Sequence, residues 1–236
     1  MQTKDIKVNP NFSQRLYYIG EEKTCVVVCD DVLEDLSAVR DIAISASKFE
    51  HESNTSYPGQ RAELARSYAE SVFPLVVSLI RQNYALPHSS LAHLNAGYFS
   101  IVTLAPEDLS LQQRIPHFDS TNPYFFAAMQ YINEGDFGGT SFYSHRPTGF
   151  ENITVDRTDK LIQSAQSLIQ KSPPKQDYFY ESDDHFLRLG TVDHKANRLV
   201  IYPGTLLHSG NIRSAKDINS DPATGRLTTN LFIEFR

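Results

Sequence analysis

Residues 114–119 read Arg114-Ile115-Pro116-His117-Phe118-Asp119 and place a histidine and an aspartate one residue apart, between two apolar runs. In an extended backbone successive side chains point to opposite faces, so His117 and Asp119 point to one side and Phe118 to the other. One strand end therefore offers two ligands for a divalent metal ion. A third protein ligand has to come from a distant part of the chain, and His208 is the best candidate.

Short strand-like runs surround this stretch and continue to the C-terminus. They are separated by turns and interrupted by one helix, expected at residues 157–171 and closed by Ser172-Pro173-Pro174. Many short strands with turns between them predict a sandwich or a jelly roll. The strands are expected at residues 91–104, 114–118, 125–132, 140–143, 197–202, 206–212 and 226–235.

The last of these runs, residues 226–233, separates polar from apolar side chains by face. Because side chains alternate along a strand, one face carries Arg226, Thr228 and Asn230, and the other carries Leu227, Leu231 and Ile233. An arginine with a hydroxyl and an amide beside it can bind a carboxylate through charged hydrogen bonds. The polar face of this strand is therefore a candidate anion site.

The N-terminal third is predicted to be mainly helical. The apolar run at residues 24–29 is predicted to be a strand, and Asp30-Asp31 offer an N-cap for a helix that runs to about residue 48. Further helical segments are expected at residues 62–69 and 75–83, with Pro74 starting the second because proline fits a first helical turn. We expect residues 1–88 to form a mainly helical flank with an N-terminal strand, and residues 89–236 to form the β core.

The segment from residue 49 to residue 61 has turn chemistry and no hydrophobic period. It is long enough to act as a lid, and Tyr57-Pro58-Gly59-Gln60-Arg61 combines an aromatic ring with an arginine, which suits ligand contact. A plain connection between two helices fits this segment equally well. Both interpretations stay open at the level of sequence.

Composition limits the classes of protein to which the chain can belong. With 236 residues and 40% apolar content it can bury a full core, so we expect a single domain spanning residues 1–236. The formal net charge of -6 gives no general attraction to phosphate backbones or anionic lipid, and we expect neither nucleic acid nor membrane as a partner.

Cysteine usage and the absence of an export signal indicate a reducing compartment. Cys25 and Cys29 lie four residues apart in one predicted strand, too distant to form a disulfide with each other. The longest apolar stretch, residues 72–80, is broken by Pro74 and Ser78, and no basic stretch followed by an apolar segment begins the chain. We expect a cytoplasmic protein, and its oligomeric state is not constrained.

Two histidines and one carboxylate on one side of a metal leave the opposite positions open, as in non-haem Fe(II) oxygenases. A 2-oxo acid fills two of these positions, and its far carboxylate needs a partner such as Arg226. Two other classes share the ligands: a cupin-like zinc or manganese hydrolase or isomerase, and a non-catalytic binding module. Binding of a 2-oxo acid through Arg226 distinguishes the oxygenase from both.

Several motifs follow one another in a fixed order across residues 90–236. The order is His117-x-Asp119, Tyr131-Ile132-Asn133-Glu134, Gly138-Gly139-Thr140-Ser141-Phe142, Tyr202-Pro203-Gly204, His208 and Arg226. This region resembles the Fe(II)/2-oxoglutarate-dependent dioxygenase superfamily, in its prolyl 4-hydroxylase-like branch. Residues 138–151 are similar to a bacterial family of unknown substrate within that branch. The sequence differs from that branch in one respect, because more residues separate His208 from Arg226. An extended polar loop at residues 213–222 accommodates the additional residues.

The resemblance implies an α+β fold, with a double-stranded β-helix core of the jelly-roll or cupin-like type and flanking N-terminal helices. It implies Fe(II), 2-oxoglutarate and molecular oxygen (O2) as cofactor and co-substrates, and hydroxylation of a peptide side chain, an amino acid or another small metabolite. By resemblance the catalytic metal ligands are His117, Asp119 and His208, and the residues that bind the co-substrate are Arg226, Tyr131, Asn230, Thr228 and Tyr98.

Overall fold

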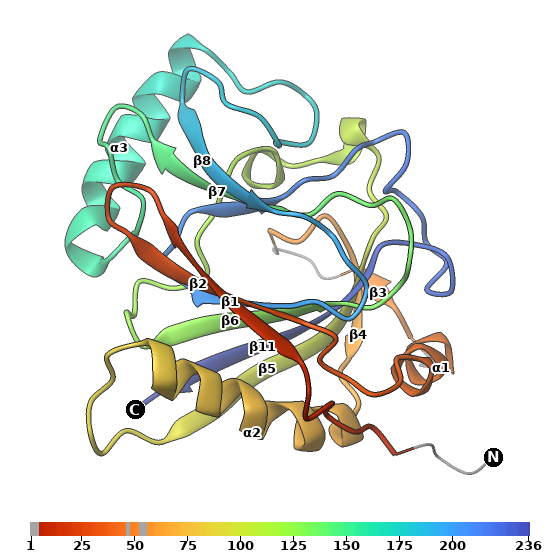
Figure 1. Cartoon of the computed structure of the whole chain (residues 1–236). Coiled ribbons are helices and arrows are strands. Elements are labelled where there is room, and N and C mark those ends of the chain that lie inside the picture. Colours follow the sequence, from red (N-terminus) through yellow and green to blue (C-terminus); the bar gives the residue numbers. More distant parts are fainter. Residues whose placement is uncertain (1–4, 46–47, 52–55) are drawn as a thin grey trace.

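The computed structural model describes residues 5–45, 48–51 and 56–236, which form a mostly β protein with three α-helices (Figure 1). The larger sheet is antiparallel and has eight strands, and the smaller antiparallel sheet has three. In spatial order the larger sheet contains β1 (Ser13–Ile19), β2 (Thr24–Asp30), β9 (Leu199–Pro203), β6 (Phe125–Tyr131), β11 (Leu227–Phe235), β5 (Ala92–Val102), β4 (Gly59–Glu63) and β3 (Glu50–His51). The smaller contains β10 (His208–Gly210), β7 (Thr140–His145) and β8 (Phe186–Val192).

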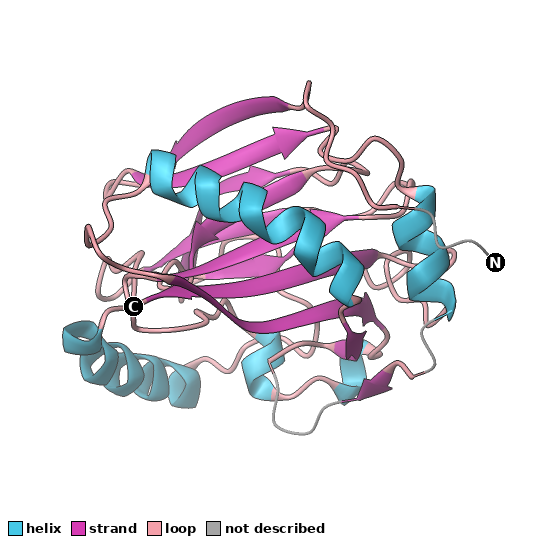
Figure 2. Cartoon of the chain, turned by 90° about the horizontal axis from the view of Figure 1, so that it is seen from below, coloured by secondary structure: helices cyan, strands magenta, loops and turns pink. Residues whose placement is uncertain are grey.

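The central strands of the larger sheet are buried on both faces, and strand alternation assigns each side chain to one of them. On β2, Val27 packs in the cluster on the outer face, and Val26 and Val28 pack in the cluster between the two sheets. Helix α2 (Arg66–Asn83) lies across the outer face (Figure 2). Its buried side chains are Tyr68, Val72, Val76, Leu79 and Ile80.

Pro74 lies inside α2, whereas the sequence led us to expect that it starts a helix. A proline in a helix interior removes the hydrogen bond to the carbonyl four residues earlier, here that of Glu70. Both Pro74 and Glu70 are exposed, so water can take the place of the missing donor. Burial of the opposite face of the helix keeps its two halves in one continuous element.

The N-terminal third contains more β structure than expected. Besides α1 (Ser37–Ser45) and α2 it contributes β1 to β4, so the larger sheet includes strands from both of the regions that we expected to be separate. Strand β1 escaped the sequence analysis because it is an edge strand on which six of seven residues are exposed. Strands β3 and β4 lie in the expected 49–61 loop, of which residues 52–55 lie outside the described residues.

The third helix, α3 (Val155–Lys171), matches the helix expected at residues 157–171. Within the described ranges, no helix is both long and apolar enough to cross a membrane. Cys25 and Cys29 on β2 are free thiols.

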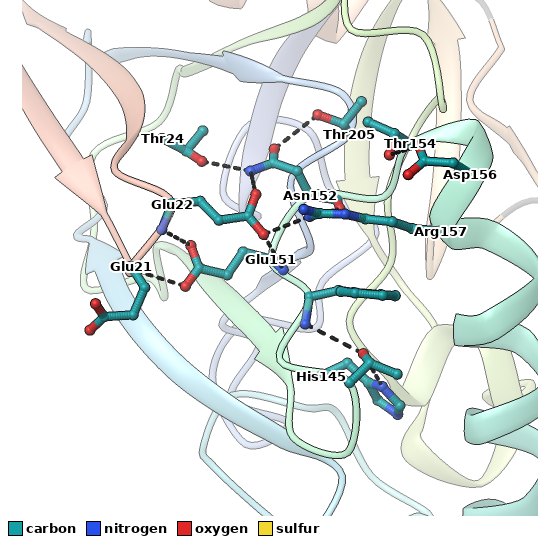
Figure 3. A network of polar contacts seen from close by, with 12 residues as sticks. Glu21, Glu22, Thr24, His145, Glu151, Asn152, Thr154, Asp156, Arg157 and Thr205 are labelled. Carbon is teal, nitrogen blue, oxygen red and sulfur yellow. Dashed lines mark hydrogen bonds and ion pairs between the residues drawn. The ribbon is translucent and has the colours of Figure 1, made fainter.

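A polar network joins the β1–β2 turn to the segment before α3 (Figure 3). The buried carboxylate of Glu151 accepts hydrogen bonds from the backbone N–H groups of Glu21 and Glu22, at 2.8 and 3.1 Å. Gly20, which precedes them, has a φ of +67°, and a Cβ there would lie 2.1 Å from the Glu151 carboxylate. The turn therefore needs both the conformational freedom and the small size of glycine. The network ties the edge of the larger sheet to the rest of the molecule.

Replacing Glu151 with alanine is expected to lower the free energy of unfolding by roughly 2–3 kcal/mol, because two backbone N–H groups lose hydrogen bonds to a charged acceptor. Chemical denaturation measures this change. Glu21→Ala is the matched control, since only the backbone of this exposed residue takes part in the network. Equal stabilities of the two variants would contradict a structural role for the buried carboxylate.

Candidate metal centre

Backbone hydrogen bonds position the three residues of the candidate centre. His117 and His208 form an antiparallel bridge in which each backbone N–H donates to the carbonyl of the other, at 2.9 and 2.8 Å. The N–H of Asp119 donates to the carbonyl of Gly204 at 2.7 Å. A Cβ at Gly204 would lie 2.6 Å from the Phe125 ring and 3.4 Å from the Asp119 Cβ, so only glycine allows this close approach.

The side chains of His117, Asp119 and His208 converge, with their ligand atoms all within 4.8 Å of one another. The two imidazole rings lie 4.4 Å apart between centroids, and His208 Nε2 is 3.7 Å from Asp119 Oδ2. His208 Nδ1 lies 2.8 Å from the carbonyl oxygen of Leu206. Because a carbonyl only accepts, Nδ1 carries the proton and Nε2 offers a lone pair toward Asp119.

The chemistry of these groups fits a bound cation. Asp119 Oδ2 is buried and has no hydrogen-bond partner among the residues that the structure describes, which is unusual for a buried carboxylate oxygen. Burial raises the pKa of Asp119, against the opposing charges of His208 and Arg61. Burial, together with His208 and Arg61, lowers the pKa of His117 well below its usual range and keeps this ring in the neutral form that binds metal. A divalent cation would satisfy the carboxylate and both imidazoles.

The three side chains line a cavity of about 880 Å³ that reaches both sheets. Four of the residues predicted to bind a co-substrate also line it, namely Arg226, Thr228, Asn230 and Tyr98. No other group of three or more His, Cys, Asp or Glu side chains within the described residues is close enough to hold a metal ion. The structure therefore brings the candidate metal ligands and a candidate anion site into one space.

Arg226 is the buried cation of this cavity, with 3% of the residue exposed. Its Nε donates to the carbonyl of Gly138 at 2.8 Å and its Nη2 to that of Gly139 at 3.1 Å. It forms no ion pair with any residue in the described part of the chain, although a buried guanidinium is usually paired with an anion. The glycine carbonyls fix the orientation of the guanidinium and leave its charge to be balanced by a ligand.

Tyr131 lies behind the cavity wall. Its hydroxyl is 2.9 Å from Thr140 Oγ1, and its ring centroid is 5.4 Å from Arg226 Cζ. Thr140, which lines the cavity, begins the strand expected at residues 140–143, but the sequence analysis assigned it no ligand role. Tyr131 is not among the residues that line the cavity, and its hydroxyl meets Thr140, which is; the direct contact of Tyr131 with a carboxylate stays a prediction.

The polar face of β11 continues across neighbouring strands. Thr228 pairs with Ser100 on β5, and Asn230 Nδ2 donates to Ser100 Oγ at 2.9 Å and to Thr228 Oγ1 at 3.2 Å. The register places Arg61 of β4 opposite the same Ser100. Arg61 therefore belongs to the cavity. From the sequence, this arginine was predicted only to lie in a possible lid, the segment at residues 49–61.

Asp217 supports Arg226 from outside the cavity. It is fully buried and accepts hydrogen bonds from the backbone N–H groups of Gly138, at 3.2 Å, and Arg213, at 2.7 Å. Arg213 also pairs with it through Nη2 at 3.0 Å. The long loop at residues 213–222 thus holds the glycine whose carbonyl orients Arg226. Its polar composition was visible in the sequence, but this role was not.

The fold and the site define a mostly β protein with a two-histidine, one-carboxylate centre inside a cavity. The sequence profile of the family described as "Family of unknown function (DUF6445)" matches residues 10–233, and the chain belongs to this family. No curated protein matches the sequence.

Two solved structures are similar to the chain in fold. HygX from Streptomyces hygroscopicus, crystallised with nickel, 2-oxoglutarate and hygromycin B bound, has 12% sequence identity and a TM-score of 0.50, over 90% of this chain and 83% of that chain. The epimerase SnoN, in complex with Fe3+, alpha ketoglutarate and nogalamycin RO, has 14% identity and a TM-score of 0.52, over 90% and 80% of the two chains. At such identities the likeness establishes the fold alone.

Asp119→Asn is expected to stabilise the metal-free protein and to abolish tight metal binding. Because burial raises the folded-state pKa of Asp119 above its unfolded value, ionisation costs wild-type stability as pH rises through that folded pKa. At neutral pH the metal-free variant should melt a few degrees higher, and the difference should vanish at acid pH. Thermal unfolding with chelator across this pH range measures it.

Titration with Mn(II) should show at least about a 100-fold loss of affinity for Asp119→Asn, since even residues outside the ligand set cost 10–100-fold. His88→Ala, at an exposed histidine, is the control and should bind Mn(II) like wild type. Wild-type affinity in Asp119→Asn would exclude this aspartate as a ligand.

Proposed function

We propose that the chain is an Fe(II)- and 2-oxoglutarate-dependent oxygenase with a double-stranded β-helix core. The observation that carries the proposal is the shared cavity, which holds three converging metal-ligand side chains and a buried guanidinium without a carboxylate partner among the described residues. The ligands bound in the HygX and SnoN structures, a metal with 2-oxoglutarate or alpha ketoglutarate, support it.

In this proposal His117, Asp119 and His208 hold Fe(II) and leave the opposite coordination positions open. Iron bound there would supply the oxidation chemistry, together with 2-oxoglutarate and O2. The bond from His208 Nδ1–H to the Leu206 carbonyl fixes the tautomer and the ring orientation, so that Nε2 is the atom offered to the metal. The backbone bridge between the two histidines fixes the spacing of their side chains.

Arg226 binds the far carboxylate of 2-oxoglutarate. A permanently charged, planar donor group held by two carbonyls offers its remaining N–H groups in a set direction, which suits bidentate recognition of a carboxylate. Thr228 and Asn230 supply neutral hydrogen-bonding groups on the same strand face, and Thr140, which Tyr131 contacts, also lines the cavity. Tyr98 lines the same cavity on β5.

The reaction that we propose is hydroxylation of a peptide side chain, an amino acid or another small metabolite, in the manner of the prolyl 4-hydroxylase-like branch. SnoN is an epimerase, so the same site geometry also supports inversion of a carbon centre as a second outcome. Product analysis for added oxygen and for changed stereochemistry distinguishes the two. The free thiols of Cys25 and Cys29 fit the cytoplasm as the location.

Anaerobic addition of Fe(II) and then 2-oxoglutarate to the wild-type protein is expected to produce a visible charge-transfer absorption band. The band requires a 2-oxo acid chelated to iron, so Zn(II) in place of Fe(II) should give none. His208→Ala should also give none, because the third ligand is lost. If wild type binds Fe(II) without developing the band, a hydrolase, an isomerase or a binding module accounts for the site instead.

Arg226→Gln is expected to weaken 2-oxoglutarate binding by roughly 10–100-fold, as charged hydrogen bonds contribute about 1.5–3 kcal/mol each. Calorimetry with Mn(II)-loaded protein measures this loss. Arg226→Lys keeps the charge in case the glutamine variant is poorly folded, and it should show a smaller loss. Arg66→Gln, at an exposed arginine, is the matched control, and Mn(II) affinity should be unchanged in all three variants.

A further inference from the structure

The phenol of Tyr202 lies in the cavity beside a candidate metal ligand. Its ring centroid is 4.7 Å from that of His208 and 5.3 Å from that of Phe142. His208 and Phe142 are cross-strand partners in the smaller sheet, so both contacts hold the ring against one pair of that sheet. Tyr202 itself belongs to β9 of the larger sheet, is 5% exposed and lines the cavity. The tyrosine therefore spans the space between the sheets, and packing sets the position of its ring.

The hydroxyl of Tyr202 forms no hydrogen bond with any residue in the described ranges. This distinguishes it from Tyr131, whose hydroxyl meets Thr140, and from Tyr178, which donates to the Leu104 carbonyl at 2.7 Å. Nor is it one of the fully enclosed polar atoms that lack a partner, so it keeps contact with the cavity. Since a buried phenol usually has a hydrogen-bond partner, a molecule in the cavity is left to supply this one.

Charges from both ends of the proposed co-substrate site act on this hydroxyl. Burial raises the pKa of Tyr202 well above its usual range, the Asp119 carboxylate adds to the rise, and the Arg226 guanidinium opposes it. Electrostatic effects weaken with distance, so the hydroxyl lies within range of both the metal ligand and the arginine. A phenol with a raised pKa keeps its proton at neutral pH, and the group is therefore a hydrogen-bond donor there.

A co-substrate that reaches from the metal centre to Arg226 passes this donor. In the proposed function Arg226 binds the far carboxylate of 2-oxoglutarate. Tyr202 lies toward the other end, in ring contact with His208 and within range of the Asp119 charge. A hydrogen bond from an O–H group to a carboxylate is stronger than one between two neutral groups, so the acid is a better partner for the phenol than water is.

We propose that Tyr202 binds the co-substrate, and that its hydroxyl donates a hydrogen bond to the metal-binding end of 2-oxoglutarate. This inference rests on the proposed function. Because His208 and Phe142 hold the phenol ring, the bond orients the 2-oxo acid group relative to the metal ligands. Arg226 then recognises the far carboxylate, and Tyr202 recognises the 2-oxo acid group itself.

Tyr202→Phe tests this role, since it removes the hydroxyl and keeps the ring that packs on His208. In calorimetry with Mn(II)-loaded protein, the variant should bind 2-oxoglutarate at least about tenfold more weakly than wild type, a difference of about 1.4 kcal/mol. The reason is the loss of a hydrogen bond to a charged group. Mn(II) affinity and melting temperature should stay at their wild-type values, because the metal ligands and the ring packing are unchanged.

Tyr143→Phe is the matched control. Tyr143 is fully buried, but it belongs to a different hydrophobic cluster from Tyr202 and is not among the residues that line the cavity. Its loss of a hydroxyl should leave 2-oxoglutarate affinity within about twofold of wild type. Equal losses of affinity in the two variants would show that any buried hydroxyl matters in this way and would remove the support for a contact at Tyr202.

The charge-transfer band of the anaerobic Fe(II) complex reports which end of the co-substrate is bonded. A donor on the 2-oxo acid group lowers the energy of the ligand orbital that receives the electron. Its loss in Tyr202→Phe should therefore move the band to shorter wavelength. Arg226→Gln changes only the contact with the far carboxylate, so at saturating 2-oxoglutarate its band should stay at the wild-type wavelength.

Three results would overturn the inference while the oxygenase assignment stands. The first is 2-oxoglutarate affinity in Tyr202→Phe within about twofold of wild type. The second is weaker binding with an unmoved band, which would assign the hydroxyl to the far carboxylate. The third is a loss of Mn(II) affinity, which would show that the hydroxyl supports His208 instead. Failure of the proposed function has a different signature, because the wild-type protein itself would then neither bind 2-oxoglutarate nor develop the band.

Discussion

The reciprocal backbone pair between His117 and His208 is the contact on which the site depends. It joins the irregular segment before β6, where the structure has an isolated bridge instead of the strand expected at residues 114–118, to β10, the edge strand of the smaller sheet; the two histidines are 91 residues apart along the chain. With Asp119 tied to the Gly204 carbonyl, the position of every candidate ligand is set by main-chain hydrogen bonds rather than by the side chains themselves. Ligands whose backbone is held in place in this way lose less conformational freedom when an ion binds.

Holding these groups requires the protein to bury charge. Asp119 and Arg226 are both largely enclosed, and neither has an oppositely charged protein partner within hydrogen-bonding distance among the described residues. The outer face of the larger sheet offsets this cost, because α2 and the apolar side chains of β11 form an extensive cluster there, which includes Leu227, Leu231, Ile233 and Phe235. The stability of this apolar cluster thus allows the cavity to contain polar groups whose binding partners are supplied by ligands.

Polar residues outside the cavity set the direction of those that line it. Asp217 holds Gly138, whose carbonyl orients Arg226, and Tyr131 holds Thr140 at the cavity wall. Cavity side chains that are held in position before a ligand binds lose less conformational entropy on binding. More of the free energy of their contacts therefore contributes to affinity. The same holds for Arg61, whose plane is fixed by Tyr57 and Tyr98.

Period-two alternation is a local property, and for that reason the sequence alone determined that His117 and Asp119 share a side and that Arg226, Thr228 and Asn230 share a face. It also determined the strand-rich C-terminal region and α3. Only the tertiary structure decided which strands are neighbours, and hence that Arg61 enters the cavity and that Tyr131 stands behind Thr140. The sequence also did not reveal the edge strand β1 or the continuous helix through Pro74. Solvent exposure leaves β1 without an apolar pattern, and packing of α2 keeps the helix continuous despite its proline. Register and burial depend on residues far apart in the chain, and no local pattern encodes them.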